Sequence, residues 1–217
     1  MFTGIIEAVG TVTQVAESGG DLRLRIHTGR LDLGDVKLGD SIATNGVCLT
    51  VVELPGDGFV ADVSRESLAH THIGQWRSGA RVNLEKALLP TTRLGGHLVS
   101  GHVDGVGTLV ARSADARSIR LTIQAPAELS RYIAAKGSIT VDGVSLTVNE
   151  LTERGFLLNI VPHTAGETTL SNAQPGQQLH LEVDMIARYL EQLLGHSSPS
   201  DTNKLTPAFL AENGFWK

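Results

Sequence analysis

Short runs of alternating apolar and polar residues, separated by glycine-containing turns, follow one another along most of the chain. Residues 22–26 (Leu-Arg-Leu-Arg-Ile) alternate strictly, which predicts a β-strand with one buried and one exposed face. Residues 41–54 form two apolar, β-branched runs around Asn45-Gly46. Both central residues of such a tight turn need a positive φ, which Asn and Gly tolerate, so this stretch predicts a β-hairpin.

The hairpin pattern occurs a second time, in residues 138–151, where Asp142-Gly143 takes the place of the first turn. Shifting the chain on itself by about 97 residues aligns residues 1–88 with residues 98–185 without a gap, and about a quarter of the aligned residues are identical. A period of this length has the size of a small domain, so the sequence indicates a duplicated domain.

Each copy of the repeat contains about six short strand patterns at regular spacing. In the first copy they begin with residues 5–15 and end with residues 82–85. A closed barrel leaves no exposed sheet edge, so this arrangement predicts one small barrel in each copy. The predicted fold class is all-β: two similar six-stranded barrels in tandem, followed by a C-terminal α-helix.

Short helices are predicted between some of the strands. Residues 64–73 look helical, with Ser64 as the N-cap, and residues 126–135 look helical, with Pro126 in the first turn. Residues 31–38 are ambiguous and could form a short helical turn.

The segment after the repeat has no counterpart in the first copy. Asp184 can cap a helix there, and its apolar stripe consists of Ile186, Tyr189, Leu190, Leu193 and Leu194. Two interpretations remain open: the stripe covers a second copy of the protein, or it packs back on its own barrel. Residues 205–216 could add a final helical turn.

Composition excludes several classes of protein. The net charge is −5 and the chain has no basic tract, which argues against a nucleic-acid partner. No run of about 18 apolar residues is present, so no membrane-spanning helix is expected. The N-terminus lacks the features of a signal peptide, and Cys48 is the single cysteine, which rules out an internal disulfide. We therefore expect a cytoplasmic protein.

The two copies differ at several chemically important positions. The pairs, first copy before second, are Ile5 and His102, Gly39 and Lys136, Cys48 and Ser145, Arg65 and Pro162, and Glu66 and His163. Two similar but unequal pockets suit a reaction between two copies of one substrate, one acting as donor and one as acceptor. The alternative for Cys48 is a small buried residue without a chemical role. His97 and His102 lack the spacing and companions of a metal site, so no metal is predicted.

Four motifs, in order, closely resemble the riboflavin synthase family. They are Met-Phe-Thr-Gly-Ile at the N-terminus, Asn45-Gly-Val-Cys-Leu-Thr-Val, Gly95-Gly-His-Leu-Val-Ser-Gly-His, and Asp142-Gly-Val-Ser-Leu-Thr-Val. The resemblance spans residue 1 to about residue 195. It implies Greek-key topology for the two barrels, with lumazine-binding domains at residues 1–97 and 98–185 and an oligomerisation helix and tail at residues 186–217.

The resemblance also implies a reaction and an assembly. Two molecules of 6,7-dimethyl-8-ribityllumazine exchange a four-carbon unit, giving riboflavin and 5-amino-6-(D-ribitylamino)uracil, in a transferase reaction without a cofactor. Subunits of the family form homotrimers through the C-terminal helix. The active site lies between the first barrel of one subunit and the second barrel of its neighbour. Association with lumazine synthase is left open.

Site residues carried over from the family fall into two groups. His102 is expected to act as the base, assisted by Ser145 and Thr147, while Ser41 and Cys48 act on the acceptor side. Lys136 is expected to reach into the partner subunit's site. The substrate-binding residues implied are Gly4, Ile5, Ile6, Cys48, Leu49, Thr50, Asp62, Val63, Ser64, Arg65, Glu66, Ser67, Gly101, His102, Val103, Lys136, Ser145, Leu146, Thr147, Ile160, Val161, Pro162, His163, Thr164 and Ala165.

Two other functions are compatible with a small barrel fold. A non-catalytic lumazine- or flavin-binding antenna protein would have the same fold, but its second copy tends to lose the site motifs. Here Gly101-His102, Lys136 and Ser145-Leu-Thr147 are all present, which favours the enzyme. A flavin-reductase barrel would need a nucleotide-binding domain, for which this chain has no room.

Overall fold

The computed structural model describes residues 1–195, and the predicted final turn at residues 205–216 lies outside them. The chain divides into two compact units, Met1–Met185 and Ile186–Lys217. The first unit contains both barrels. Within the described residues, no helix is long and apolar enough to cross a membrane.

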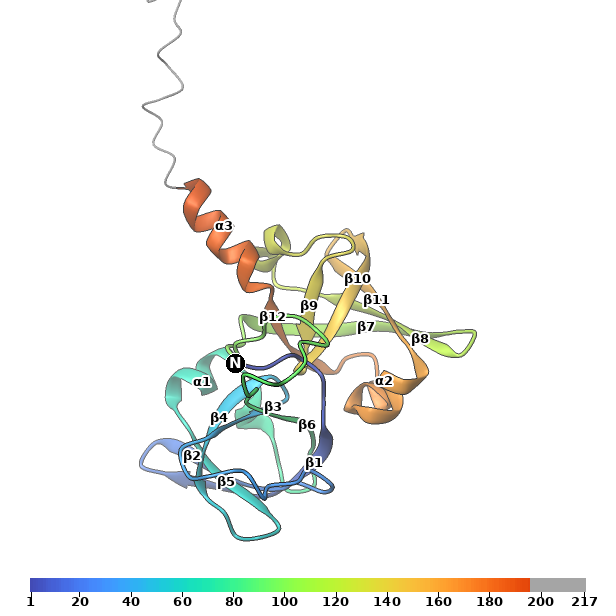
Figure 1. Ribbon diagram of the computed structural model, residues 1–217. Coiled ribbons are helices and arrows are strands. Elements are labelled where there is room, and N and C mark those ends of the chain that lie inside the picture. Colours follow the sequence, from blue (N-terminus) through green and yellow to red (C-terminus); the bar gives the residue numbers. More distant parts are fainter. Residues whose placement is uncertain (196–217) are drawn as a thin grey trace, which may run out of the picture. The chain divides into compact units, whose positions relative to one another are not determined.

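The first copy of the repeat forms a closed barrel of six antiparallel strands in the order β1-β2-β5-β4-β3-β6 (Figure 1). Its strands are β1 (Ala8–Ser18), β2 (Asp21–His27), β3 (Ser41–Thr44), β4 (Val47–Glu53), β5 (Gly58–Val63) and β6 (Arg81–Lys86). A short helix α1 (Arg65–His70) and a 3₁₀ turn η1 (Ile73–Gln75) connect β5 to β6. Because β5 lies beside β2, the connections are those of a Greek key.

The second copy closes in the equivalent order, β10-β11-β8-β7-β12-β9. Its strands are β7 (Gly105–Asp115), β8 (Ser118–Gln124), β9 (Ser138–Val141), β10 (Val144–Thr152), β11 (Gly155–Ile160) and β12 (Gln178–Val183). The helical segments are η2 (Ala127–Tyr132), α2 (Pro162–Glu167) and η3 (Thr169–Asn172). The prediction of two six-stranded barrels is confirmed.

Three local predictions need correction. Residues 126–135 do not form an α-helix: the segment is the 3₁₀ helix η2, whose Leu129 and Ile133 are buried in the second barrel's core. Residues 31–38 form turns rather than a helix, and the first strand begins at Ala8 rather than at residue 5. For residues 126–135, burial of Leu129 and Ile133 in the core overrides the local helical pattern, whereas residues 31–38 had no clear pattern.

Both predicted hairpin turns have the expected backbone. Asn45 and Asp142 each have φ of 45°, followed by Gly46 at 80° and Gly143 at 81°. Two consecutive positive φ angles are the property of the tight turn whose twist matches that of the flanking strands. The two turns touch, because a Cβ on Gly46 would lie 2.8 Å from the backbone nitrogen of Gly143.

The last strand of each barrel is buried on both faces. On β6, Val82 and Leu84 point into the barrel core, as expected for alternation. The residues between them, Asn83 and Glu85, point outward and are also buried. Strand β12 repeats this pattern with the buried, outward-facing residues His180 and Glu182. We call the contact of β6 and β12 with the opposite barrels the seam.

Polar side chains of the seam bind the neighbouring barrel's hairpin turn. Asn83 Nδ2 donates to the carbonyl of Asp142 (2.9 Å), and His180 Nδ1 lies 2.9 Å from the carbonyl of Asn45. Asn83 and His180 are equivalent in the repeat, as are the two turns. The barrels are therefore joined by a pseudo-symmetric pair of buried hydrogen bonds, which fixes their relative placement within the first unit.

The second unit begins after Met185 and contains most of helix α3 (Met185–Gly195). The predicted helix is confirmed. Its apolar stripe, Ile186, Tyr189, Leu190, Leu193 and Leu194, is 53–72% exposed.

Candidate functional site

The outer face of the β3–β4 hairpin carries the first set of predicted residues. Leu49 points into the barrel core, so its neighbours Cys48 and Thr50 point outward. The strand register places Ser41 opposite Thr50 and Ala43 opposite Cys48. The hairpin therefore presents a hydroxyl-rich strip with one thiol at its end nearest the turn.

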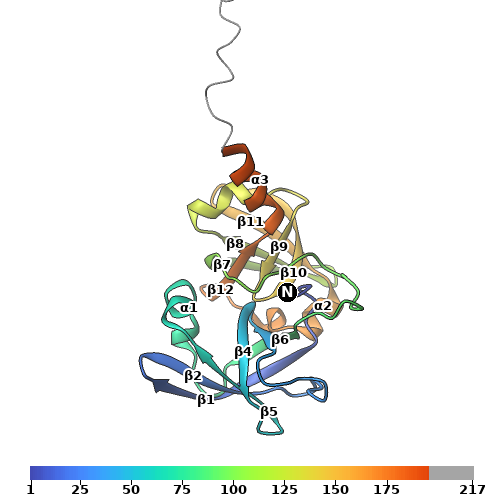
Figure 2. The same cartoon turned by 60° about the vertical axis from the view of Figure 1, so that its left-hand side comes forward.

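A pocket of about 250 Å³ opens beside this strip. Its lining residues are Val47, Cys48, Glu66, Ser67, His70, Thr71, Gly101, His102 and Val103. They come from β4, from helix α1 and its C-terminal end, and from a segment of the second copy. Figures 1 and 2 show α1 next to β4. Side chains of α1 form one wall of the pocket.

Helix α1 is held in place by the predicted N-cap. The Ser64 side chain accepts a hydrogen bond from the backbone N–H of Ser67 (3.2 Å), which satisfies one of the donors at the helix start. One turn later, His70 Nε2 lies 3.1 Å from Glu66 Oε1. The cap thus stabilises the start of the helix that carries Glu66, Ser67 and His70 in the pocket lining.

The segment that closes the pocket belongs to the second copy and requires glycine. The backbone N–H of Cys48 donates to the carbonyl of Gly101 (2.8 Å). Gly101 has φ of 80°, and a Cβ there would lie 2.7 Å from Cys48 Cβ and 2.8 Å from the Phe2 ring. A side chain at position 101 would push this segment off the hairpin and move His102 out of the pocket.

The second barrel has the equivalent arrangement, in which the N-terminal segment completes the hairpin face. The N–H of Ser145 donates to the carbonyl of Gly4 (2.7 Å), and a Cβ on Gly4 would lie 2.6 Å from Ser145 Cβ. Ile6 packs against the core of the second barrel, while Val103 packs against the core of the first. The two segments are exchanged: each copy's segment completes the hairpin face of the other copy's barrel.

This exchange changes the expected grouping around His102. We expected Ser145 and Thr147 to assist His102, but the structure places His102 in the pocket with Cys48. Ser145 Oγ instead lies 2.7 Å from His97 Nδ1. The repeat aligned equivalent residues correctly, but nothing in an alignment of two copies reveals that segments cross between them.

His97 is a residue whose place in the site sequence reasoning missed. Its Nε2 lies 3.3 Å from Thr140 Oγ1, so the ring is held between two hydroxyls of the β9–β10 hairpin. The side chain is buried, and burial lowers its pKa, which favours the neutral imidazole. Its position in the Gly95-Gly-His motif was the available signal, but we weighed the histidine only as a metal ligand.

Other predicted residues of the first copy lie around the pocket rather than in it. Arg65 Nε donates to the carbonyl of Gly20 (3.3 Å). Asp62 Oδ1 lies 3.5 Å from Arg23 Nη1. Val63 is part of the barrel core.

In the second copy, Ile160 and Ala165 are core residues, and Leu146 packs partly against that core. Val161, Pro162 and His163 are exposed at the start of α2, and the Thr164 carbonyl accepts from Thr168 Oγ1 (2.8 Å). Thr147 is exposed and lies opposite Ser138. Lys136 has φ of 66°, and its N–H donates to the Val148 carbonyl (2.7 Å).

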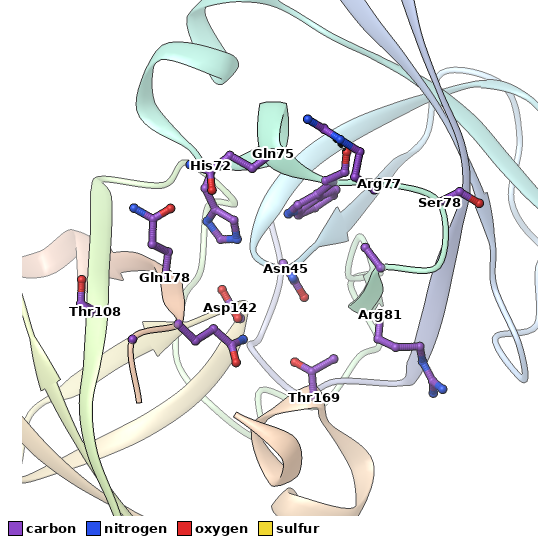
Figure 3. A pocket seen from close by; sticks show the side chains of 14 residues that line it. Asn45, His72, Gln75, Arg77, Ser78, Arg81, Thr108, Asp142, Thr169 and Gln178 are labelled. Carbon is purple, nitrogen blue, oxygen red and sulfur yellow. Dashed lines mark hydrogen bonds between the residues drawn. The ribbon is translucent and has the colours of Figure 1, made fainter. Parts of the chain in front are cut away.

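A larger crevice of about 810 Å³ is lined by residues of both barrels (Figure 3). His72, Asn45 and Asp142 surround it, and none of the residues lining it was predicted for the site. Burial raises the pKa of Asp142 to about 7. It lowers the pKa of His180, whose backbone N–H donates to Asp142 Oδ1, to about 3. Both side chains serve the seam, so we assign this crevice no part in the reaction.

The described residues contain no group of three or more His, Cys, Asp or Glu side chains that could hold a metal ion. The polar groups around both hairpin faces are hydroxyls, imidazoles, backbone amides, one thiol and the Glu66 carboxylate. Such groups suit an uncharged heterocycle with several hydrogen-bonding atoms and a hydroxylated side chain.

The comparison with protein families identifies both copies of the repeat. The model described as the lumazine binding domain matches residues 3–87 and again residues 100–184. The riboflavin synthase of Photobacterium phosphoreum is 50% identical over 216 residues, covering 99% of each chain. The chain belongs to the riboflavin synthase family.

Other relatives agree along the whole length. The riboflavin synthase of Actinobacillus pleuropneumoniae is 43% identical over 217 residues, covering 99% of this chain and 100% of that protein. The riboflavin synthase of Bacillus subtilis is 40% identical over 216 residues, with the same coverage. The resemblance found in the four motifs is therefore confirmed at full length, and the chain is that of an enzyme.

Solved structures with a similar fold include LumP complexed with riboflavin, with a TM-score of 0.78. LumP complexed with 6,7-dimethyl-8-(1'-D-ribityl) lumazine gives 0.76. Both are 24% identical in sequence and cover 84% of this chain and 99% of LumP. At this identity the similarity supports the tandem-barrel fold and says nothing about turnover.

Proposed function

We propose that the chain catalyses the dismutation of 6,7-dimethyl-8-ribityllumazine. The observation that carries this proposal is the pair of equivalent hairpin faces, at Cys48 and at Ser145, each completed by a glycine segment from the other copy. Two equivalent sites suit a reaction in which both substrates are the same molecule. The names of the full-length relatives support the same reaction.

The chemistry balances without another reactant. One lumazine donates a four-carbon unit and becomes 5-amino-6-(D-ribitylamino)uracil; the other accepts the unit and becomes riboflavin. Each molecule supplies what the other needs, so no external oxidant, reductant or cofactor enters. We therefore place the enzyme among the transferases and expect no metal requirement.

Proton transfer starts the reaction. The C7 methyl group of the lumazine is acidic because its anion delocalises into the ring, and a positioned base removes the proton. His102, next to Cys48 in the first barrel's pocket, is our candidate for this role. Ser41 and Cys48 would then contact the lumazine bound at the first barrel, and Ser145, held by His97, would contact the lumazine at the second.

The two lumazines that react come from different subunits in this proposal. Phe2 and Val99 form an antiparallel pair through two backbone hydrogen bonds. Gly4 lies two residues beyond Phe2 in one direction and Gly101 two residues beyond Val99 in the other. The two glycine segments therefore lead to different hairpin faces, at Cys48 and at Ser145. A neighbouring subunit can bring its second barrel against the first barrel's pocket.

Several further properties belong to the proposal because the family implies them. We propose a homotrimer assembled through α3, a cytoplasmic location, and a contribution from Lys136 to the neighbour's site. The exposed apolar stripe of α3 supports the assembly.

The direct test is incubation of the purified protein with the lumazine alone, after dialysis against a chelator. We expect riboflavin and 5-amino-6-(D-ribitylamino)uracil to form in equal amounts, with two lumazines consumed for each riboflavin. Tight binding of lumazine without product would identify a non-catalytic binder instead. Activity that disappears with the chelator and returns with a metal would contradict the cofactor-free reaction.

A further inference from the structure

We propose that two buried glutamates, Glu85 and Glu182, are positioning residues that act crosswise. Glu182, on the last strand of the second barrel, organises the ligand site of the first barrel. Glu85, on the last strand of the first barrel, organises the ligand site of the second. This inference rests on the proposed function of the two hairpin faces as lumazine sites.

Both glutamates are on the outward face of their barrels, where carboxylates are normally exposed. Glu85 is 4% exposed and Glu182 is 5% exposed. Burial raises the pKa of each carboxyl, and the hydrogen bonds that each accepts oppose this effect. A carboxyl group held in such a place without a salt bridge to a described residue needs its hydrogen-bond partners.

Glu182 binds the segment that enters the first barrel's pocket. Its Oε1 accepts from the N–H and from the hydroxyl of Ser100, both at 2.7 Å, and its Oε2 accepts from the N–H of Gly101 at 3.0 Å. The Ser100 hydroxyl oxygen in turn accepts from the N–H of His102 (3.2 Å). One carboxylate thus fixes three consecutive residues, the last of which carries the candidate base.

Glu85 makes the same contacts at the equivalent positions of the first copy. Oε1 accepts from the N–H of Thr3 (2.6 Å) and from its hydroxyl (2.7 Å), and Oε2 accepts from the N–H of Gly4 (2.9 Å). The Thr3 hydroxyl oxygen accepts from the N–H of Ile5 (3.2 Å). The repetition of all four contacts shows that the clamp belongs to the repeated unit itself.

The crosswise effect follows from where the clamped segments go. In the segment held by Glu182, the Gly101 carbonyl accepts a hydrogen bond from the N–H of Cys48, in the first barrel. In the segment held by Glu85, the Gly4 carbonyl accepts a hydrogen bond from the N–H of Ser145, in the second barrel. Each glutamate is therefore attached to one barrel and shapes the ligand face of the other.

The test uses Glu182→Gln and Glu85→Gln as matched variants, each the control for the other. Glutamine keeps the size of the side chain, but its amide NH₂ faces N–H donors and cannot accept from them. Riboflavin is the probe, because it binds without turnover. Its binding is titrated by fluorescence in the unmodified protein and after alkylation of Cys48, the only cysteine, which blocks the first barrel's pocket.

Binding at the first barrel is the part that alkylation of Cys48 removes. We expect Glu182→Gln to weaken this binding by about ten- to a hundredfold, and to change the binding that remains after alkylation by no more than about twofold. Glu85→Gln should do the reverse. A purely structural role would weaken both sites in both variants, and that result, or an effect on each glutamate's own barrel, overturns the proposal. If a glutamine variant does not fold, Ser100→Ala and Thr3→Val give the same crosswise comparison, with Ser100→Thr expected to restore binding.

Failure of the proposed function gives a different result. An unmodified wild-type protein that binds no riboflavin, or whose binding is unaffected by alkylation of Cys48, contradicts the assignment of the hairpin faces as ligand sites. Normal wild-type binding without the crosswise pattern contradicts the role of the glutamates alone.

Discussion

The two hairpin faces differ in single residues, and the proposed reaction assigns them different roles on that basis. The first face offers Cys48 and, across the exchanged segment, His102. The second offers Ser145, whose hydroxyl is paired with His97. The two faces share a backbone framework and differ in their side chains, and in the proposed reaction this difference separates the donor lumazine from the acceptor.

Replacement of His102 tests its role as the base. His102→Ala should lower kcat for riboflavin formation by about 10²–10⁴-fold, because general-base catalysis contributes that much, while riboflavin still binds. Cys48→Ser should have a milder effect, since the second copy has serine at the equivalent position. Steady-state kinetics and equilibrium titration on the same preparations separate the two effects. An unchanged kcat for His102→Ala would remove this residue from the mechanism.

Asp142 gives a prediction about pH and stability. Burial raises its pKa from an ordinary value of 3.8 to about 7, so the folded protein holds a proton that the unfolded chain releases. The stabilisation by this group is complete below its ordinary pKa and is lost as pH rises through about 7. His180 stays neutral throughout, because burial lowers its pKa to about 3.

Asp142→Asn should remove this pH dependence, as Asn45 already occupies the equivalent turn of the first copy. Between pH 5 and pH 8, the free energy of unfolding of the wild type should fall by about 1–4 kcal/mol more than that of the variant. Urea denaturation at several pH values measures both. Parallel pH profiles for the two proteins would show that Asp142 is ionised in the folded state.

At the residue scale, the motifs named several residues that the structure brings together, and their roles in the reaction stay predictions. Cys48, Glu66, Ser67 and His102 were predicted and line one pocket. Glu182 was missed, because the sequence shows only a conventional strand position in the repeat. Its importance arises from burial on the outer face of the barrel, which depends on the second barrel and cannot be read from one strand.

The elements of the fold were largely predictable because their signals are local. The two Asn/Asp-Gly turns and the Ser64 cap are determined by backbone conformations that few residues tolerate or stabilise. The failure at residues 126–135 has the opposite origin. Those residues favour an α-helix locally, but burying Leu129 and Ile133 in the barrel imposes a 3₁₀ helix.

Removal of helix α3 tests its role in assembly. A chain ending at Met185 keeps both barrels, so its free energy of unfolding per subunit should change little. Loss of the apolar stripe from Ile186 to Leu194 should disrupt the oligomer and lower activity much more than stability. Analytical ultracentrifugation and thermal unfolding provide the comparison. A truncated protein that sediments with the subunit number of the full-length protein would contradict the role of α3.

At the scale of the whole molecule, the duplication and the barrels were visible in the sequence, but the exchange of segments was not. The repeat shows which residues are equivalent, and equivalent residues here belong to different barrels' ligand faces. The antiparallel contact of Phe2 with Val99 sends Gly4 and Gly101 in opposite directions. Only the three-dimensional structure assigns His102 to the first barrel's site.

The central claim is that the reacting lumazines bind to the first barrel of one subunit and the second barrel of another. Two inactive proteins test it. One carries Cys48→Ala with His102→Ala, which removes groups from the first barrel's face. The other carries Ser145→Ala with Lys136→Ala, which removes groups that the second barrel supplies, to its own face and to the neighbour's site. Subunits are mixed in equal amounts, and their exchange is confirmed with mass-tagged chains.

The measurement is the rate of riboflavin formation after exchange. If the active site bridges subunits, a mixed oligomer places an intact first barrel against an intact second barrel, and in random trimers roughly a quarter of the sites recover. If the site lies within one chain, every site keeps one damaged half. Activity that stays at the level of the separate variants, with exchange demonstrated, would contradict the account.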